Sequence, residues 1–183
     1  MKHMLPIAFG VLAVSIGAIA QSSPDIDKAL TAAPDQMKAA ATVIHWKPDF
    51  TYDTLKKGTN RMVCYDLSGK PTHERFPFLV ECTSIANLDR VAQNLKFEAI
   101  SDKDARQAAF DKAEKDGSRV KPEFGSVWIH KMGPDAEHIR THTTVAVPGA
   151  TTQSLGLPDS GKEGGVWIMN AGSTTAHLMI PGN

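Results

Sequence analysis

The spacing of apolar residues changes twice along this 183-residue chain. Short runs rich in β-branched and aromatic side chains, at residues 42–46 and 62–65, are typical of strands. Between residues 85 and 116, apolar residues recur at steps of three and four, as they do on one face of a helix. Strand-length runs return after Pro122. This order predicts an α+β fold with a largely antiparallel sheet, built mainly by the C-terminal half, and with the central helices packed on one face.

Glycine, proline and helix-capping residues set the expected limits of these elements. The first central helix is predicted over residues 85–99. A capping signal that starts at Ser101 indicates a second helix over residues 102–116, and Gly117 is typical of its end. Residues 66–77 contain glycine and proline and are expected to form a loop. The runs after Pro122 predict strands at residues 126–130, 143–147, 166–169 and 176–180.

The first twenty residues have the pattern of a secretory signal peptide. Lys2 precedes an apolar run over residues 4–17, and Ala18-Ile19-Ala20 is a small-x-small cleavage site. The run is shorter than the ~20 residues that a membrane-spanning helix needs. We therefore expect an exported, periplasmic or secreted protein with no membrane span in its mature form. Residues 21–183 are expected to form a single α+β domain, in which residues 21–33 are a flexible leader or a short helix.

The two cysteines, Cys64 and Cys82, predict a disulfide, because an even pair in an oxidising compartment usually forms one. The alternative is a redox pair or a metal site. That alternative would require CxxC spacing or a nearby cluster of histidine and cysteine, and the sequence has neither. The bridge is expected to pin the loop that precedes the central helices.

The balance of acidic and basic residues limits the kinds of partner that the chain can bind. Lysine and arginine number 20, and so do aspartate and glutamate. Loss of Lys2 with the signal peptide leaves a nearly neutral chain with no basic field for nucleic acid and no polybasic membrane anchor. A nucleic-acid partner is therefore not expected.

Histidines in the C-terminal β region are the candidate site residues. His138 and His142, with Glu137 beside them, are four residues apart and could share a zinc ion only on a helix, where that spacing is about 6 Å. On a strand the same spacing is about 13 Å. The threonines around His142 favour a strand, and the HExxH pattern is absent. A metal is therefore possible here but not favoured.

His142 and His177 form a better candidate pair. Each stands at the start of an apolar β run that ends in proline, so neighbouring strands would place both imidazoles at one edge of the sheet. Glu137 or Asp135 could complete such a site, and Asn170 or Thr175 could donate hydrogen bonds. In the structural alternative, the two histidines only bond backbone carbonyls at strand ends.

Several segments together resemble a family of exported bacterial proteins with no assigned function. These are AATVIHW at residues 40–46, GTN at residues 58–60 leading to Cys64, and residues 164–181, where the likeness is strongest. The chain departs from the family after Asn60, where Arg61 and Met62 stand in place of an aromatic residue. The family carries a histidine at both positions of the candidate pair. The resemblance implies export and a single fold, and it supplies no reaction.

No recognisable catalytic motif occurs: the GxSxG elbow and the phosphate-loop spacing are both absent. The sequence therefore favours a non-enzymatic protein that binds a small ligand or a partner, in a pocket near residues 161–175 and His177. The alternative is a small metal-dependent or acid–base enzyme that uses His142 and His177, with His138 or His130 as a third group. A third hypothesis is an envelope-associated protein whose exposed β edge recruits a partner. The identity of the ligand stays open.

Overall fold

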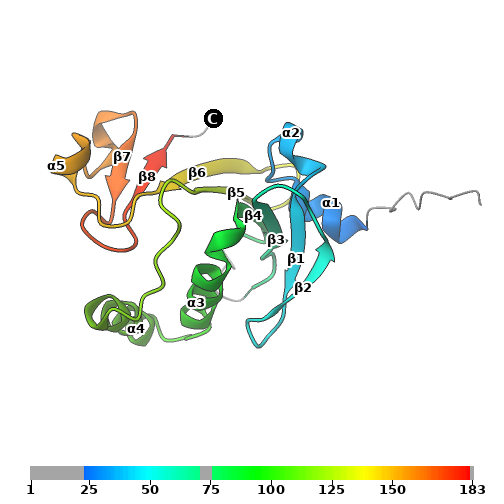
Figure 1. Cartoon of the computed structure of the whole chain (residues 1–183), viewed down its shortest axis with the longest axis horizontal. Coiled ribbons are helices and arrows are strands. Elements are labelled where there is room, and N and C mark those ends of the chain that lie inside the picture. Colours follow the sequence, from blue (N-terminus) through cyan, green and yellow to red (C-terminus); the bar gives the residue numbers. More distant parts are fainter. Residues whose placement is uncertain (1–22, 71–75, 182–183) are drawn as a thin grey trace, which may run out of the picture.

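A computed structural model describes residues 23–70 and 76–181, so the predicted signal peptide lies outside the described residues. An eight-stranded sheet runs through the described part in the order β2-β1-β3-β4-β5-β6-β8-β7 (Figure 1). Neighbouring strands are antiparallel except for β1 and β3, which run parallel. The strands are β1 Thr42–Trp46, β2 Tyr52–Lys56, β3 Met62–Asp66, β4 Phe78–Ser84, β5 Val127–Gly133, β6 Arg140–Ala146, β7 Trp167–Met169 and β8 His177–Ile180.

The α+β class and the largely antiparallel sheet are confirmed. The N-terminal half contributes more than the sequence pattern suggests, because β1 to β4 make up half of the strands of the sheet. The predicted C-terminal strands are all present, with ends that differ by a few residues. No strand was predicted at residues 78–84, where β4 lies at the centre of the sheet and is almost wholly buried.

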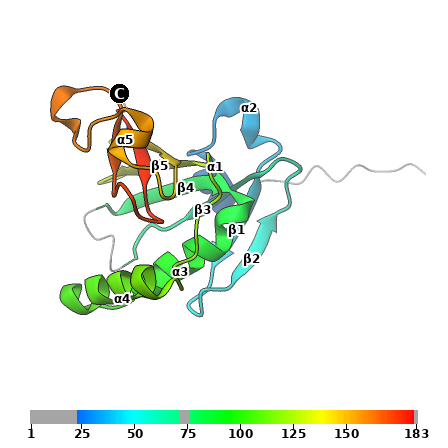
Figure 2. The ribbon, with the colours of Figure 1, turned by 60° about the vertical axis from the view of Figure 1, so that its left-hand side comes forward.

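Helices cover both faces of the sheet. The predicted central helices form α3 Leu88–Glu98, preceded by the 3₁₀ turn η2 Ile85–Asn87, and α4 Lys103–Asp116. Asp102, rather than Ser101, caps α4 by accepting a hydrogen bond from the backbone N–H of Ala105 at 2.7 Å. Figure 2 shows α3 and α4 together beneath the strands. The core between α3 and the sheet contains residues such as Ile44, Tyr65, Leu79 and Val91.

The opposite face packs against α1 Pro24–Leu30, so residues 24–30 of the expected leader form its short-helix alternative. The remaining short helices are α2 Asp35–Lys38, α5 Thr152–Leu155 and the 3₁₀ turn η3 Gly161–Glu163. Across residues 23–70 and 76–181, every helix is too short or too polar to span a bilayer.

The predicted disulfide between Cys64 and Cys82 is present, and it lies in the core beneath α1. The two residues face each other directly in the β3–β4 ladder, with their Cα atoms 4.1 Å apart. The bridge therefore joins two central strands. The predicted loop connects these two strands in sequence, and its residues 71–75 lie outside the described residues.

Candidate functional site

A cavity of about 290 Å³ opens on the α3 side of strands β5, β6 and β8. Successive residues of a strand point to opposite faces, so alternate residues of β5 and β6 reach this cavity together. The opposing helix α3 contributes one charged and one amide side chain. The cavity is lined by Arg90, Asn94, Pro122, Trp128, His130, Met132, His142, Thr144, Ala146, Thr175, Ala176 and His177.

A row of polar side chains crosses the sheet toward this cavity. Tyr65, Glu81 and His130 occupy directly opposed positions on β3, β4 and β5. The Tyr65 hydroxyl donates to Glu81 Oε2 at 3.0 Å, and His130 Nδ1 lies 2.7 Å from Glu81 Oε1. Burial, together with the charge of Glu81, raises the pKa of Tyr65 well above its usual range, so the phenol stays protonated. The Glu81 carboxylate therefore orients His130 through Nδ1 and leaves its Nε2 as the other functional nitrogen.

His142 lies opposite His130 on β6, and their ring centroids are 5.7 Å apart. Burial lowers the pKa of His130, but the charge and hydrogen bond of Glu81 outweigh burial, and the net shift is upward. Burial lowers the pKa of His142, and the charges of His130 and His177 add to that effect. The two neighbouring imidazoles therefore hold their protons over different ranges of pH.

His177 starts β8 at the other end of the cavity. Its Nδ1 lies 2.7 Å from the carbonyl oxygen of Thr175, and because a carbonyl only accepts, Nδ1 carries the proton. This contact is the backbone-carbonyl bond of the structural alternative. His177 nevertheless lines the cavity, so one residue satisfies both descriptions.

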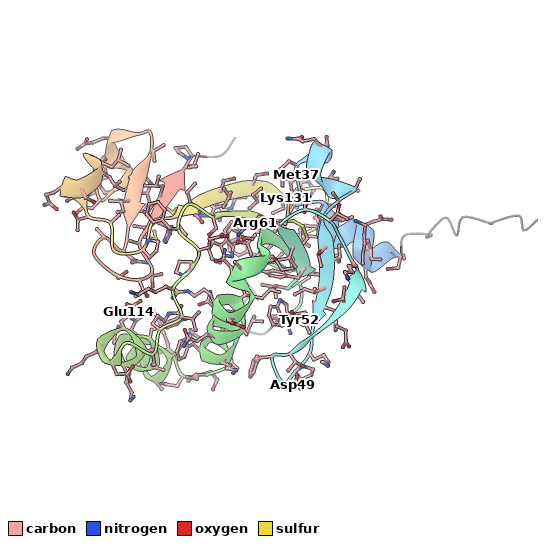
Figure 3. The ribbon with its side chains drawn as sticks, in the orientation of Figure 1. Met37, Asp49, Tyr52, Arg61, Glu114 and Lys131 are labelled. Carbon is pink, nitrogen blue, oxygen red and sulfur yellow. A yellow bond between two sulfur atoms is a disulfide. The ribbon has the colours of Figure 1, made fainter. Side chains whose placement is uncertain are left out.

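Arg90 on α3 supplies a buried positive charge, with a relative exposure of 3%. It donates to the carbonyl oxygen of Val120 at 2.5 Å and to the hydroxyl of Thr175 at 3.0 Å. The Thr175 hydroxyl in turn donates to Glu114, which extends from α4 (Figure 3). Burial, helped by the charge of Arg119, lowers the pKa of Arg90 to about 10, so its guanidinium remains protonated at neutral pH.

The structure brings some of the predicted site residues together and separates others. His142 and His177 lie on the neighbouring strands β6 and β8 and share the cavity, although Ala146 is the residue directly opposite His177. His138 and Glu137 lie in the exposed β5–β6 turn, where His138 Nδ1 is 2.9 Å from Asp135 Oδ1. His138 and His142 therefore do not converge. Of the predicted segment 161–175, Thr175 lines the cavity and residues 161–174 do not.

The sequence reasoning missed Glu81 and Arg90 and gave His130 only a secondary place. A signal for Glu81 exists, because it is a lone carboxylate within an apolar run. Arg90 left no such signal, since a charged residue beside the apolar stripe of a helix is usually solvated. Among residues 23–70 and 76–181, no three histidine, cysteine, aspartate or glutamate side chains are grouped so that they could hold a metal ion.

No family model, curated protein or solved structure matches this chain.

Proposed function

We propose that this protein binds a small organic molecule in the cavity between α3 and strands β5, β6 and β8. The observation that carries the proposal is the composition of the cavity wall. Trp128 and Met132 offer apolar contact area, while His142, His177 and Arg90 offer hydrogen bonds from three separate elements. Small-ligand sites combine a mostly apolar wall with a few convergent polar groups in this way, at volumes from about 300 Å³ upward.

Filling the cavity is expected to abolish binding without unfolding the protein. Ala146 lines the cavity from β6, so Ala146→Leu would place three extra carbon atoms in the ligand's space. Fragments of low molecular weight, screened by ligand-observed NMR, should bind the wild-type protein and lose binding in this variant. Val145→Leu, on the other face of the same strand, is the matched control and should bind normally. Fragments that bind Ala146→Leu as well as wild type would contradict the proposed site.

We also propose that the protein is exported to the periplasm or the exterior. The signal-peptide pattern of the first twenty residues supports this, as does the resemblance to an exported family. The Cys64–Cys82 disulfide adds support, because such bonds persist mainly in oxidising compartments. The intact mass of the protein recovered outside the cytoplasm decides the question, and a first residue of Gln21 is expected.

Acid–base catalysis is the second candidate function, and the His130–His142 pair favours it. Neighbouring groups whose pKa values are pushed apart are suited to act as an acid and a base on one substrate. His130, held by Glu81, would be the acid, and His142 the base. If so, a ligand that carries a C–H next to a carbonyl should exchange that hydrogen for deuterium in D₂O, and His142→Gln should stop the exchange. Binding without any exchange would leave the protein a binding module.

A further inference from the structure

We infer that the ligand of this cavity carries a carboxylate and that Arg90 is its receptor, an inference that rests on the proposed binding function. A guanidinium has five N–H donors. Arg90 donates through Nη1 to the Val120 carbonyl and the Thr174 hydroxyl, and through Nη2 to the Thr175 hydroxyl. Its Nε–H and one N–H of Nη2 are left unassigned. Among the described residues, the fully buried side-chain nitrogens without a partner belong to Trp46 and Arg119. Nε of Arg90 has no partner within the described part of the chain either and is not among them, so this donor is not sealed in the core, and the cavity is the space that Arg90 lines.

The charges around Arg90 leave room for an anion. Its hydrogen bonds go to a carbonyl and to threonine hydroxyls. The charge of Glu114 acts on Arg90, but the hydrogen bonds between them run through Thr174 and Thr175. None of the described residues that line the cavity carries a carboxylate. A buried charge is stabilised by a hydrogen-bonded partner of opposite sign, so an anionic ligand would complete the site.

The neighbours of Arg90 offer donors to the same anion. Asn94 accepts from Arg119 through Oδ1, which leaves its Nδ2 amide as the group that it presents. His177 bonds Thr175 through Nδ1, so its Nε2 is the nitrogen that can meet a ligand in the cavity. A planar guanidinium fork matches the two oxygens of a carboxylate in a bidentate pair.

The apolar residues of the cavity indicate which chemical group the ligand carries besides its carboxylate. Trp128 and Met132 line the cavity from β5, whereas Arg90 lines it from α3, and they present an aromatic and a thioether surface. The chemical class that fits both ends is a small monocarboxylate with an aromatic or branched apolar body.

Matched acids and amides test the inference directly. Phenylacetate and phenylacetamide, followed by a small series of other aromatic and branched pairs, would be titrated into the wild-type protein by calorimetry and by ¹H–¹⁵N NMR. The acids are expected to bind at least tenfold more tightly than their amides, with shifts at Arg90, Asn94 and His177. Equal affinity within the pairs would overturn the inference and leave the proposed function standing. Absence of binding by every acid, while neutral fragments bind, would also overturn it. If neither acids, amides nor fragments bind, both proposals fail.

Substitution at Arg90 separates charge from shape. Arg90→Lys keeps the positive charge and removes the fork, so it should weaken the acids about tenfold more than it weakens the amides. Arg61→Gln is the control, because Arg61, which Figure 3 labels, is an exposed guanidinium. It pairs with Glu123. Should Arg90→Lys fail to fold, the acid–amide comparison in the wild type still decides. Inorganic phosphate is the competitor: displacement of phenylacetate by phosphate at lower concentration would show that the site prefers phosphate and would overturn the carboxylate assignment.

Discussion

Loss of the Cys64–Cys82 disulfide is expected to lower the free energy of unfolding by about 3 kcal/mol, the value for a closed loop of this length. For a domain of this size, that loss corresponds to a fall of roughly 10 °C in the thermal midpoint. The effect should fall on the whole fold, because the bridge joins directly opposed residues of β3 and β4 at the centre of the sheet. Both cysteines are fully buried, so reductant should act only slowly on the native protein.

Urea unfolding of the oxidised protein, the reduced protein and the Cys64→Ala/Cys82→Ala variant measures this contribution. The variant should be at least as unstable as the reduced protein, since it also loses two buried sulfur atoms. Reductant should leave the variant's midpoint unchanged, which controls for effects on the solvent. An unchanged midpoint after complete reduction, verified by counting thiols, would show that the bridge does not stabilise the fold.

The strand that carries Cys82, β4, could not be predicted from the sequence. A strand that is buried on both faces has no polar alternation, so its continuous apolar run does not reveal whether it is strand, helix or loop. Residues 78–84, FLVECTS, give a weaker signal still, because only the first three are an apolar run and Glu81 interrupts it. No strand was therefore assigned between the predicted loop and the next helix. Helix α3 was predictable because apolar residues recur along it at helical spacing, and α4 because a capping signal precedes it and Gly117 ends it. The C-terminal strands were predictable because glycine, proline and serine separate their apolar runs.

The candidate site was predictable only in part, for a related reason. His142 and His177 could be recognised because each begins an apolar run. That His130 faces His142 depends on the register of β5 against β6, and a shift of one residue would turn one of them to the other face. Arg90 reaches the cavity from a helix that is distant in sequence from all three histidines, and only the tertiary fold brings them together.

Removal of the Glu81 carboxylate is expected to have the second large effect. The side chains of Glu81 and His130 are only 13% and 21% exposed, so Glu81→Ala leaves His130 and the Tyr65 hydroxyl without their shared partner. Breaking a buried pair of this kind by removing one member costs about 3 kcal/mol. Glu81→Gln should cost less, because an amide oxygen can still accept from Tyr65.

The dependence of stability on pH tests whether the loss in Glu81→Gln comes from the Glu81–His130 ion pair. Glu81 raises the pKa of His130 in the folded protein, so the pair's contribution is fully present below the unfolded histidine pKa of about 6.5. The contribution is lost as the pH rises through the higher pKa of the folded state. In Glu81→Gln, burial, the largest influence, lowers the pKa of His130, and the charge of Glu98 still opposes it. The stability difference between wild type and Glu81→Gln should therefore be full below a pH of about 6.5 and shrink as the pH rises through the raised pKa of His130.

Urea unfolding at several pH values, with NMR titration of His130, tests both parts of this expectation. Glu137→Gln is the matched control. Glu137 is exposed in the β5–β6 turn, so this substitution removes one carboxylate without changing a contact of His130. Its stability difference from wild type should be small at every pH. The pKa of His142, lowered by burial first and by the charge of His130 second, should rise in Glu81→Gln, because a neutral His130 no longer opposes its protonation. A stability difference for Glu81→Gln that stays constant with pH would mean that Glu81 acts by packing and hydrogen bonding alone, and that the charge on His130 is not coupled to the fold.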